Sequence, residues 1–130
     1  SPTDAFVTEQ AAVLDFENRV RLAAVAANEP FLFYTGVGEN HFTGIMAWSL
    51  KGLKKALQRI GTKSLEFHNS RGDFEKWAEN SLYDKPLAEN LKKIRLSKMK
   101  GETLRKSLIR VVKERFDELN KQTQAATKHF

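Results

Sequence analysis

One short stretch of the chain, residues 64–77, holds the side chains that acid–base chemistry uses. It contains His68 and, five positions later, Asp73, together with three aromatic residues. A carboxylate that holds one nitrogen of an imidazole ring leaves the other nitrogen to move a proton, as a general base does. The same two residues also have a structural interpretation, in which His68 bridges the turn into the next helix and Asp73 caps that helix. We favour the structural interpretation, because no serine in the sequence stands out as a nucleophile.

Aromatic residues near this stretch raise a second question, whether the chain forms a small ligand pocket. Most of them recur at helical or strand spacing, which is typical of core residues. Tyr34 and Trp48 flank a glycine-rich loop and are the best candidates for an exposed contact. The residues that such a pocket would combine are Tyr34, His41, Trp48, His68, Asp73 and Trp77.

The glycine-rich loop itself, Gly36-Val37-Gly38, follows an apolar run, as phosphate-binding loops do. Position 41 is His41 rather than the third glycine of a dinucleotide fingerprint, and no Gly-Lys-Ser or Gly-Lys-Thr follows. We therefore interpret the loop as a turn between two short strands. The three histidines, His41, His68 and His129, lack the spacing of a metal site, and the chain has no cysteine. We expect neither a metal nor a cofactor.

The strongest signal of a binding function is a concentration of positive charge late in the chain. The net charge is +6, the bases crowd residues 92–115, and residues 1–30 carry more acids than bases. A basic surface of this kind attracts phosphate groups or an acidic protein without reading a sequence. A solvated helix face, or pairing with the acidic N-terminal part of the same molecule, would explain the same pattern. The residues that we expect to contact nucleic acid or a partner are Lys92, Lys93, Arg95, Lys98, Lys100, Lys106, Arg110 and Lys113.

The elements that position these residues are predicted to be mainly helices. The first helix spans residues 3–28 and is apolar on two opposite faces, which favours a central helix or an oligomer interface. Pro30 ends it, because the residue before a proline avoids the α region. The short apolar segments 31–35 and 45–48 are candidates for the two strands of a hairpin.

The later helices each begin where a side chain can cap them or a glycine or proline marks a boundary. We expect helices at residues 50–60 with Ser49 as the cap, from Ser64 over a short segment, at 74–82 with Asp73 as the cap, at 85–95 after Asp84, and at about 102–121, with a basic linker at 96–101.

Together these elements predict a mainly α protein, an irregular bundle of five or six helices with one small β-hairpin near residues 31–48. The length of 130 residues suits one domain, which we place at residues 1–121, followed by a frayed tail at 122–130. No apolar run approaches the roughly 20 residues that span a bilayer, and no signal peptide is visible. We expect no membrane contact and a cytoplasmic protein.

A pattern of short motifs runs through about residues 30–95. It consists of Tyr34-Thr35, Thr43-Gly44, Ser49-Leu50, Ser64-Leu65-Glu66-Phe67-His68, Gly72-Asp73-Phe74-x-x-Trp77 and Asp84 with Leu87-Ala88. In this pattern the chain resembles a family of uncharacterised prokaryotic helical modules, most of them archaeal. The resemblance implies a single helical domain in a cytoplasmic setting and carries over no catalytic residue.

These observations lead to one expected function and two alternatives. We expect a non-enzymatic binding module whose basic C-terminal surface contacts nucleic acid or an acidic protein partner. The first alternative is a structural or oligomerisation domain without a ligand, with a homodimer formed through the 3–28 helix. The second, which we favour least, is a small enzyme or ligand pocket around His68 and Asp73.

Overall fold

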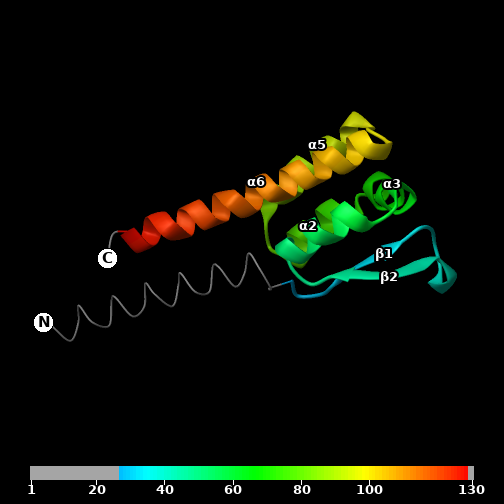
Figure 1. Cartoon of the computed structure of the whole chain (residues 1–130), viewed down its shortest axis with the longest axis horizontal. Coiled ribbons are helices and arrows are strands. Elements are labelled where there is room, and N and C mark those ends of the chain that lie inside the picture. Colours follow the sequence, from blue (N-terminus) through cyan, green and yellow to red (C-terminus); the bar gives the residue numbers. More distant parts are fainter. Residues whose placement is uncertain (1–26, 129–130) are drawn as a thin grey trace, which may run out of the picture.

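A computed structural model of the protein describes residues 27–128, with side chains as far as residue 122. In this part of the chain a two-stranded antiparallel hairpin precedes five α-helices, which confirms a mainly helical protein with a small hairpin (Figure 1). The strands are β1 (Phe31–Tyr34) and β2 (Phe42–Ala47), with a 3-10 turn, η1, at Glu39–His41. The helices are α2 (Leu50–Arg59), α3 (Thr62–Arg71), α4 (Asp73–Asn80), α5 (Lys85–Ser97) and α6 (Gly101–Lys128). The helix predicted at 3–28, and a dimer formed through it, lie outside the described residues.

The elements are arranged in three layers (Figure 1). The hairpin forms one outer layer, with β1 against α3 and β2 against α2. On the other side of these helices lie α5 and α6, where α4 packs on α5 and both α2 and α3 pack on α6. The side chains that fill the space between the layers are fully buried, among them Phe33, Leu53, Leu65, Leu104 and Leu108. Truncating one such leucine to alanine typically costs about 2–5 kcal/mol of stability.

Local capping signals correctly predict where α2 and α5 begin. The Ser49 hydroxyl accepts the Gly52 N–H at 2.9 Å and caps α2. The Asp84 carboxylate accepts the Leu87 N–H at 3.0 Å and caps α5. Both side chains satisfy an amide that the first turn of a helix would otherwise leave unpaired.

The caps predicted for α3 and α4 are wrong. Gly61 precedes α3, and Ser64 lies inside this helix, where its hydroxyl donates to the Tyr34 carbonyl at 2.6 Å. Gly72, at φ 74°, both ends α3 and precedes α4. Asp73 is therefore the first residue of α4, and its carboxylate turns to His68 instead of capping the helix.

The last two helices are longer than predicted. Helix α5 continues to Ser97, and Lys98 in the left-handed region (φ 58°) ends it, so only the turn before Gly101 remains of the expected linker. The Gly101 N–H donates to the Glu66 carboxylate at 3.2 Å, which anchors the start of α6 on α3. Helix α6 ends at Lys128, so the predicted tail at 122–130 is helical up to that residue. Of the helices within residues 27–128, none has both the length and the apolar composition needed to cross a bilayer.

Candidate functional site

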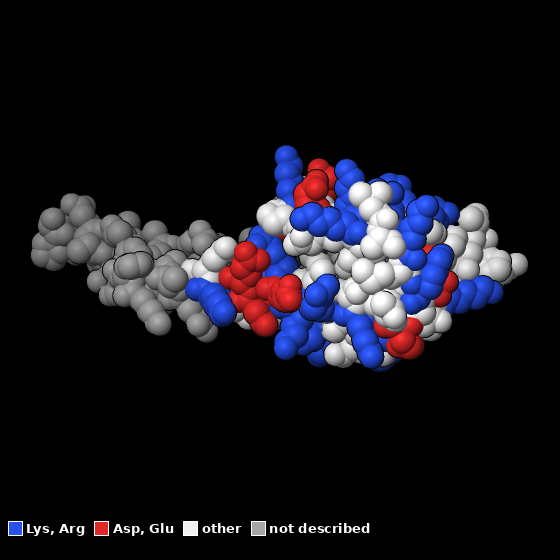
Figure 2. All heavy atoms as spheres, turned by 90° about the horizontal axis from the view of Figure 1, so that it is seen from above, with Lys and Arg blue, Asp and Glu red and all other residues white. Residues whose placement is uncertain are grey.

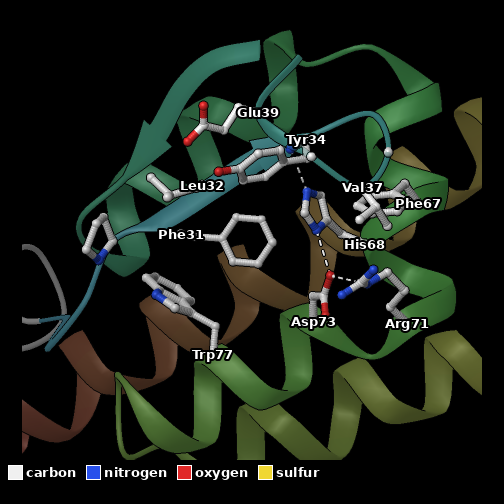
Figure 3. A pocket seen from close by; sticks show the side chains of 13 residues that line it. Phe31, Leu32, Tyr34, Val37, Glu39, Phe67, His68, Arg71, Asp73 and Trp77 are labelled. Carbon is white, nitrogen blue, oxygen red and sulfur yellow. Dashed lines mark hydrogen bonds and ion pairs between the residues drawn. The ribbon is translucent and has the colours of Figure 1, made fainter. Parts of the chain in front are cut away.

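A pocket of about 530 Å³ opens between β1, the loop that follows it, α3 and α4 (Figure 3). Four of the six predicted pocket residues line it, namely Tyr34, His68, Asp73 and Trp77. The other two, His41 and Trp48, do not line it. His41 packs over the loop backbone and lies near the Thr35 hydroxyl, and Trp48 points into solvent beyond the end of β2 with 56% of its surface exposed.

His68 is the most constrained polar residue of this pocket, with only 4% of its surface exposed. Its Nε2 accepts the backbone N–H of Tyr34 at 2.8 Å, and its Nδ1 lies 2.8 Å from the Asp73 carboxylate (Figure 3). A nitrogen that accepts an N–H carries no proton, so the proton of the neutral ring is on Nδ1 and points to Asp73. The imidazole thereby joins β1, α3 and α4.

Burial favours the neutral form of the His68 ring. Burial lowers its pKa below the ordinary value of 6.5; the hydrogen bond and charge of Asp73 act in the opposite sense, and the Arg71 charge lowers it further. A general base needs a free lone pair that reaches the substrate, and here the Nε2 lone pair is taken up by the Tyr34 N–H. His68 thus bridges neighbouring elements as the structural interpretation expects, but Asp73 pairs with its ring, as in the acid–base interpretation, instead of capping α4.

Arg71 is the exposed charged group of the same network, and the sequence did not single it out as a site residue. Its Nε lies 3.2 Å from the Asp73 carboxylate, and its guanidinium carbon lies 4.8 Å from the centre of the Phe67 ring. The Arg71 side chain is 51% exposed, whereas that of Asp73 is 22% exposed. Phe67 and Arg71 are four residues apart on α3, a spacing that places two side chains on the same face of a helix. That spacing is the sequence signal by which this pair could have been found.

The glycine-rich loop forms one wall of the pocket and is a turn between strands, as predicted. The Thr35 N–H donates to the His41 carbonyl at 2.9 Å, and the His41 N–H donates to the Gly38 carbonyl at 3.0 Å. A Cβ atom at Gly36 would lie 3.2 Å from Nδ1 of the His41 ring, and Gly38 has φ +105°. Both glycines are thus required by the shape of the loop.

The eight predicted contact bases divide into seven exposed residues and one internal one. Arg95 forms an ion pair with Glu75 and is half-buried. The other seven are exposed, and none forms an ion pair with another residue of the described chain. We call these seven the α5–α6 basic surface: Lys92, Lys93, Lys98, Lys100, Lys106, Arg110 and Lys113.

The α5–α6 basic surface has a depression and is not uniformly positive. Between α5 and α6 lies a shallow depression of about 280 Å³, which Lys93 lines from α5 and Arg110 from α6. Glu114 also lines it, and Asp117 and Glu118 follow along α6. Figure 2 looks onto this side and shows Lys and Arg spread over it, with the largest group of acidic residues near the grey part of the chain and smaller ones elsewhere.

Two further arginines of α6 serve the fold. Arg105 donates to the carbonyls of Leu57 and Ile60 at 2.7 and 2.6 Å and so satisfies the C-terminal end of α2. Arg115 donates to the Asp84 carboxylate at 2.8 Å. Burial lowers the pKa of Arg115, but its bonds to Asp84 and Glu118 outweigh this effect and raise it. Within residues 27–128, no three His, Cys, Asp or Glu side chains gather closely enough to hold a metal ion.

Comparison with known proteins places the C-terminal part of the chain near an uncharacterised family. The sequence model of a family of unknown function (DUF5752) matches residues 69–130. The match includes Asp73, Trp77 and the whole α5–α6 basic surface, and it begins one residue after His68. No curated protein and no solved structure matches the chain significantly. The archaeal distribution and the motif at residues 64–68, which precedes the matched residues, stay predictions.

Proposed function

We propose that this protein is a non-enzymatic binding module whose α5–α6 basic surface contacts the phosphate backbone of a nucleic acid. The observation that carries the proposal is the exposure of seven bases without an ion-pair partner among the described residues. Because no described carboxylate pairs with these cations, we expect them to be available to an external anion. Neutralising phosphates releases counterions from the nucleic acid, and this release drives binding at low salt.

The residue types of the surface favour phosphate contacts over base reading. Six of its seven residues are lysines, and a lysine acts as a flexible point charge rather than as a two-pronged donor to a base edge. The depression between the two helices is lined by one cation from α5, Lys93, and one from α6, Arg110. We expect binding that is sensitive to salt and largely insensitive to sequence.

The non-enzymatic part of the proposal rests on His68. This residue is the natural candidate for a general base, and both of its ring nitrogens are engaged by the protein. A catalytic histidine would need one nitrogen open to the substrate. We place the protein in the cytoplasm, where nucleic acid is accessible.

The test is a titration of fluorescein-labelled single-stranded and double-stranded DNA and RNA, followed by fluorescence anisotropy at about 50 and 200 mM salt. The test variant is Lys93→Gln/Arg110→Gln, which removes both cations of the depression. The matched control is Lys51→Gln/Lys63→Gln, which removes two equally exposed lysines from α2 and α3. The test variant should bind roughly tenfold more weakly at the lower salt, and its salt slope should be smaller by about 1–2.

Each outcome has a distinct meaning. Equal weakening in the two variants would show that net charge, and not this surface, attracts the nucleic acid. Absence of binding at the lower salt would overturn the proposal. An acidic protein partner, or self-association detected by sedimentation, would then be the better explanation of the exposed bases.

A further inference from the structure

The pocket beside β1 lies on the hairpin side of α3, whereas α5 and α6, which carry the α5–α6 basic surface, lie on the other side of α2 and α3 (Figure 1). Its volume of about 530 Å³ is within the roughly 300–1,000 Å³ typical of small-molecule sites. From its side chains we propose that it binds a small anion with a flat aromatic body. The proposal does not depend on nucleic-acid binding.

The walls of the pocket are suited to a flat ring. Phe31 is held at its base, stacked on Phe74 with ring centres 4.9 Å apart, and Trp77 meets Phe31 edge-on at 5.9 Å. Figure 3 shows Tyr34 and Trp77 on opposite sides of Phe31. Trp77 is fixed by its indole N–H, which donates to the Glu29 carbonyl at 2.7 Å. A planar ligand would thus meet aromatic groups whose positions are already set, so little ordering is required on binding.

The sign of the ligand's charge follows from Arg71. Asp73 and the Phe67 ring hold the guanidinium in place, and its terminal amino groups form no hydrogen bond with the described residues. A fixed guanidinium with free amino groups can donate two parallel hydrogen bonds to a carboxylate or a phosphate. The Phe67 face is already covered by Arg71, so a cationic ligand would have to displace a positive charge there.

Among the described lining residues, the other exposed acid lies away from this cation. Glu39 stands on the far side of Tyr34 from Arg71 in Figure 3. An anionic group placed at the terminal amino groups of Arg71 would have the Glu39 carboxylate farther away. The nearer carboxylate, Asp73, is already engaged by His68 and by the Nε of Arg71. His68 contributes shape only, since its buried ring has both nitrogens engaged.

Three probes with the same ring and different charges test the proposal: phenyl phosphate, benzyl alcohol and phenyltrimethylammonium. The protein contains two tryptophans, so a Trp48→Phe variant leaves Trp77 as the only tryptophan reporter. Phenyl phosphate should change the Trp77 emission saturably, with a Kd of about 1 mM for a ligand of this size. Benzyl alcohol and phenyltrimethylammonium should each bind at least about tenfold more weakly.

Two arginine variants in the Trp48→Phe background separate the site from general charge. Arg71→Gln should weaken phenyl phosphate binding by about tenfold or more, and Arg110→Gln, which removes the same charge on the opposite layer, should leave it unchanged. Both arginines are exposed, so both variants should fold, which circular dichroism would check. Glu39→Gln should leave binding equal or slightly tighter.

Three results would overturn the proposal. The first is absence of saturable binding by any of the three probes at concentrations up to about 10 mM, well above the expected Kd. The second is a preference for phenyltrimethylammonium together with loss of binding in Glu39→Gln, which would assign the pocket to a cation. The third is unchanged phenyl phosphate binding in Arg71→Gln, which would remove Arg71 from the site.

Discussion

The polar side chains of His68, Asp73 and Arg71 in the pocket have partners within the protein, whereas those of the α5–α6 basic surface have none among the described residues. Around the pocket, His68 has a partner at each ring nitrogen, and the Asp73 carboxylate serves both His68 and Arg71. In the described part of the chain, no buried side-chain nitrogen or oxygen lacks a hydrogen-bond partner. On α5, α6 and the turn between them, the seven bases of the α5–α6 basic surface have no such side-chain partner among the described residues.

This difference in pairing indicates which polar residues stabilise the fold. A buried polar group without a hydrogen bond costs about 1–3 kcal/mol, so burial forces pairing. An exposed lysine is solvated by water and has no need of a partner in the folded chain. Replacing a buried, paired polar residue should therefore lower the stability of the fold. An exposed, unpaired base is instead available to a ligand. On α6, Arg105 is an example of the paired residues and Arg110 of the exposed ones.

Among the variants that test this comparison, we expect His68→Ala to have the largest effect on the free energy of unfolding. This change removes two hydrogen bonds and a ring that packs 4.8 Å from Phe31, and it leaves the Tyr34 N–H and the Asp73 carboxylate without their partner. We expect the free energy of unfolding in urea to fall by about 2–4 kcal/mol. The control His41→Ala removes an exposed histidine and should change it by less than about 0.5 kcal/mol. Similar losses in both variants would contradict the role assigned to His68.

A smaller effect separates two of the three arginines of α6, Arg105 and Arg110. Arg105→Gln removes the donor to the Leu57 and Ile60 carbonyls, and we expect it to lower the free energy of unfolding by about 1–3 kcal/mol. Arg110→Gln should change this free energy by less than about 0.5 kcal/mol, because its guanidinium is exposed. Urea unfolding of the two variants side by side measures the difference. A destabilised Arg110→Gln would show that this residue also supports the fold.

The smallest effect is on pH dependence. Because the pKa of His68 is lowered in the folded state, the unfolded chain binds the proton more readily. The neutral His68 ring therefore contributes to stability in full above the ordinary pKa of 6.5. This contribution is lost as the pH falls from 6.5 through the lower pKa that His68 has in the folded state. The slope contributed by one such group is at most about 1.4 kcal/mol per pH unit.

Comparison of wild type with His68→Gln isolates this contribution. Free energies of unfolding measured between about pH 7 and pH 5 should fall more steeply in the wild type than in the variant. Parallel curves would mean that the buried ring does not stay neutral as the pH falls.

Sequence reasoning succeeds where the partners of a residue are close in the chain. Ser49 and Asp84 cap helices through amides three residues away, and both caps are correctly predicted. A local signal suffices here because the first turn of a helix fixes the geometry of its own cap. The antiparallel hairpin was anticipated on similar grounds, from two short apolar segments that flank a glycine-rich turn.

The same reasoning fails where a side chain suited to capping a helix bonds another group instead. Ser64 and Asp73 have side chains suited to capping, but Ser64 bonds the Tyr34 carbonyl, 30 residues away, and Asp73 bonds His68 across the turn at Gly72. The Tyr34 carbonyl is not part of the local pattern, because only the packing of β1 on α3 brings it to Ser64. The pairing of Asp73 with His68 is a local alternative to the cap, and the left-handed turn at Gly72 decides between the two. Composition similarly identified the bases without indicating that Arg95 would pair with Glu75.

The sequence by itself determined the helical class, the two local caps and the set of candidate bases, since each depends on residue type and near neighbours. The tertiary structure decided the rest. It placed His68 between Tyr34 and Asp73, used both ring nitrogens, and left Arg71 at the rim of a pocket with its amino groups unpaired among the described residues. The physical reason is that burial and hydrogen-bond pairing are properties of distant segments brought into contact, and only the folded chain defines those contacts.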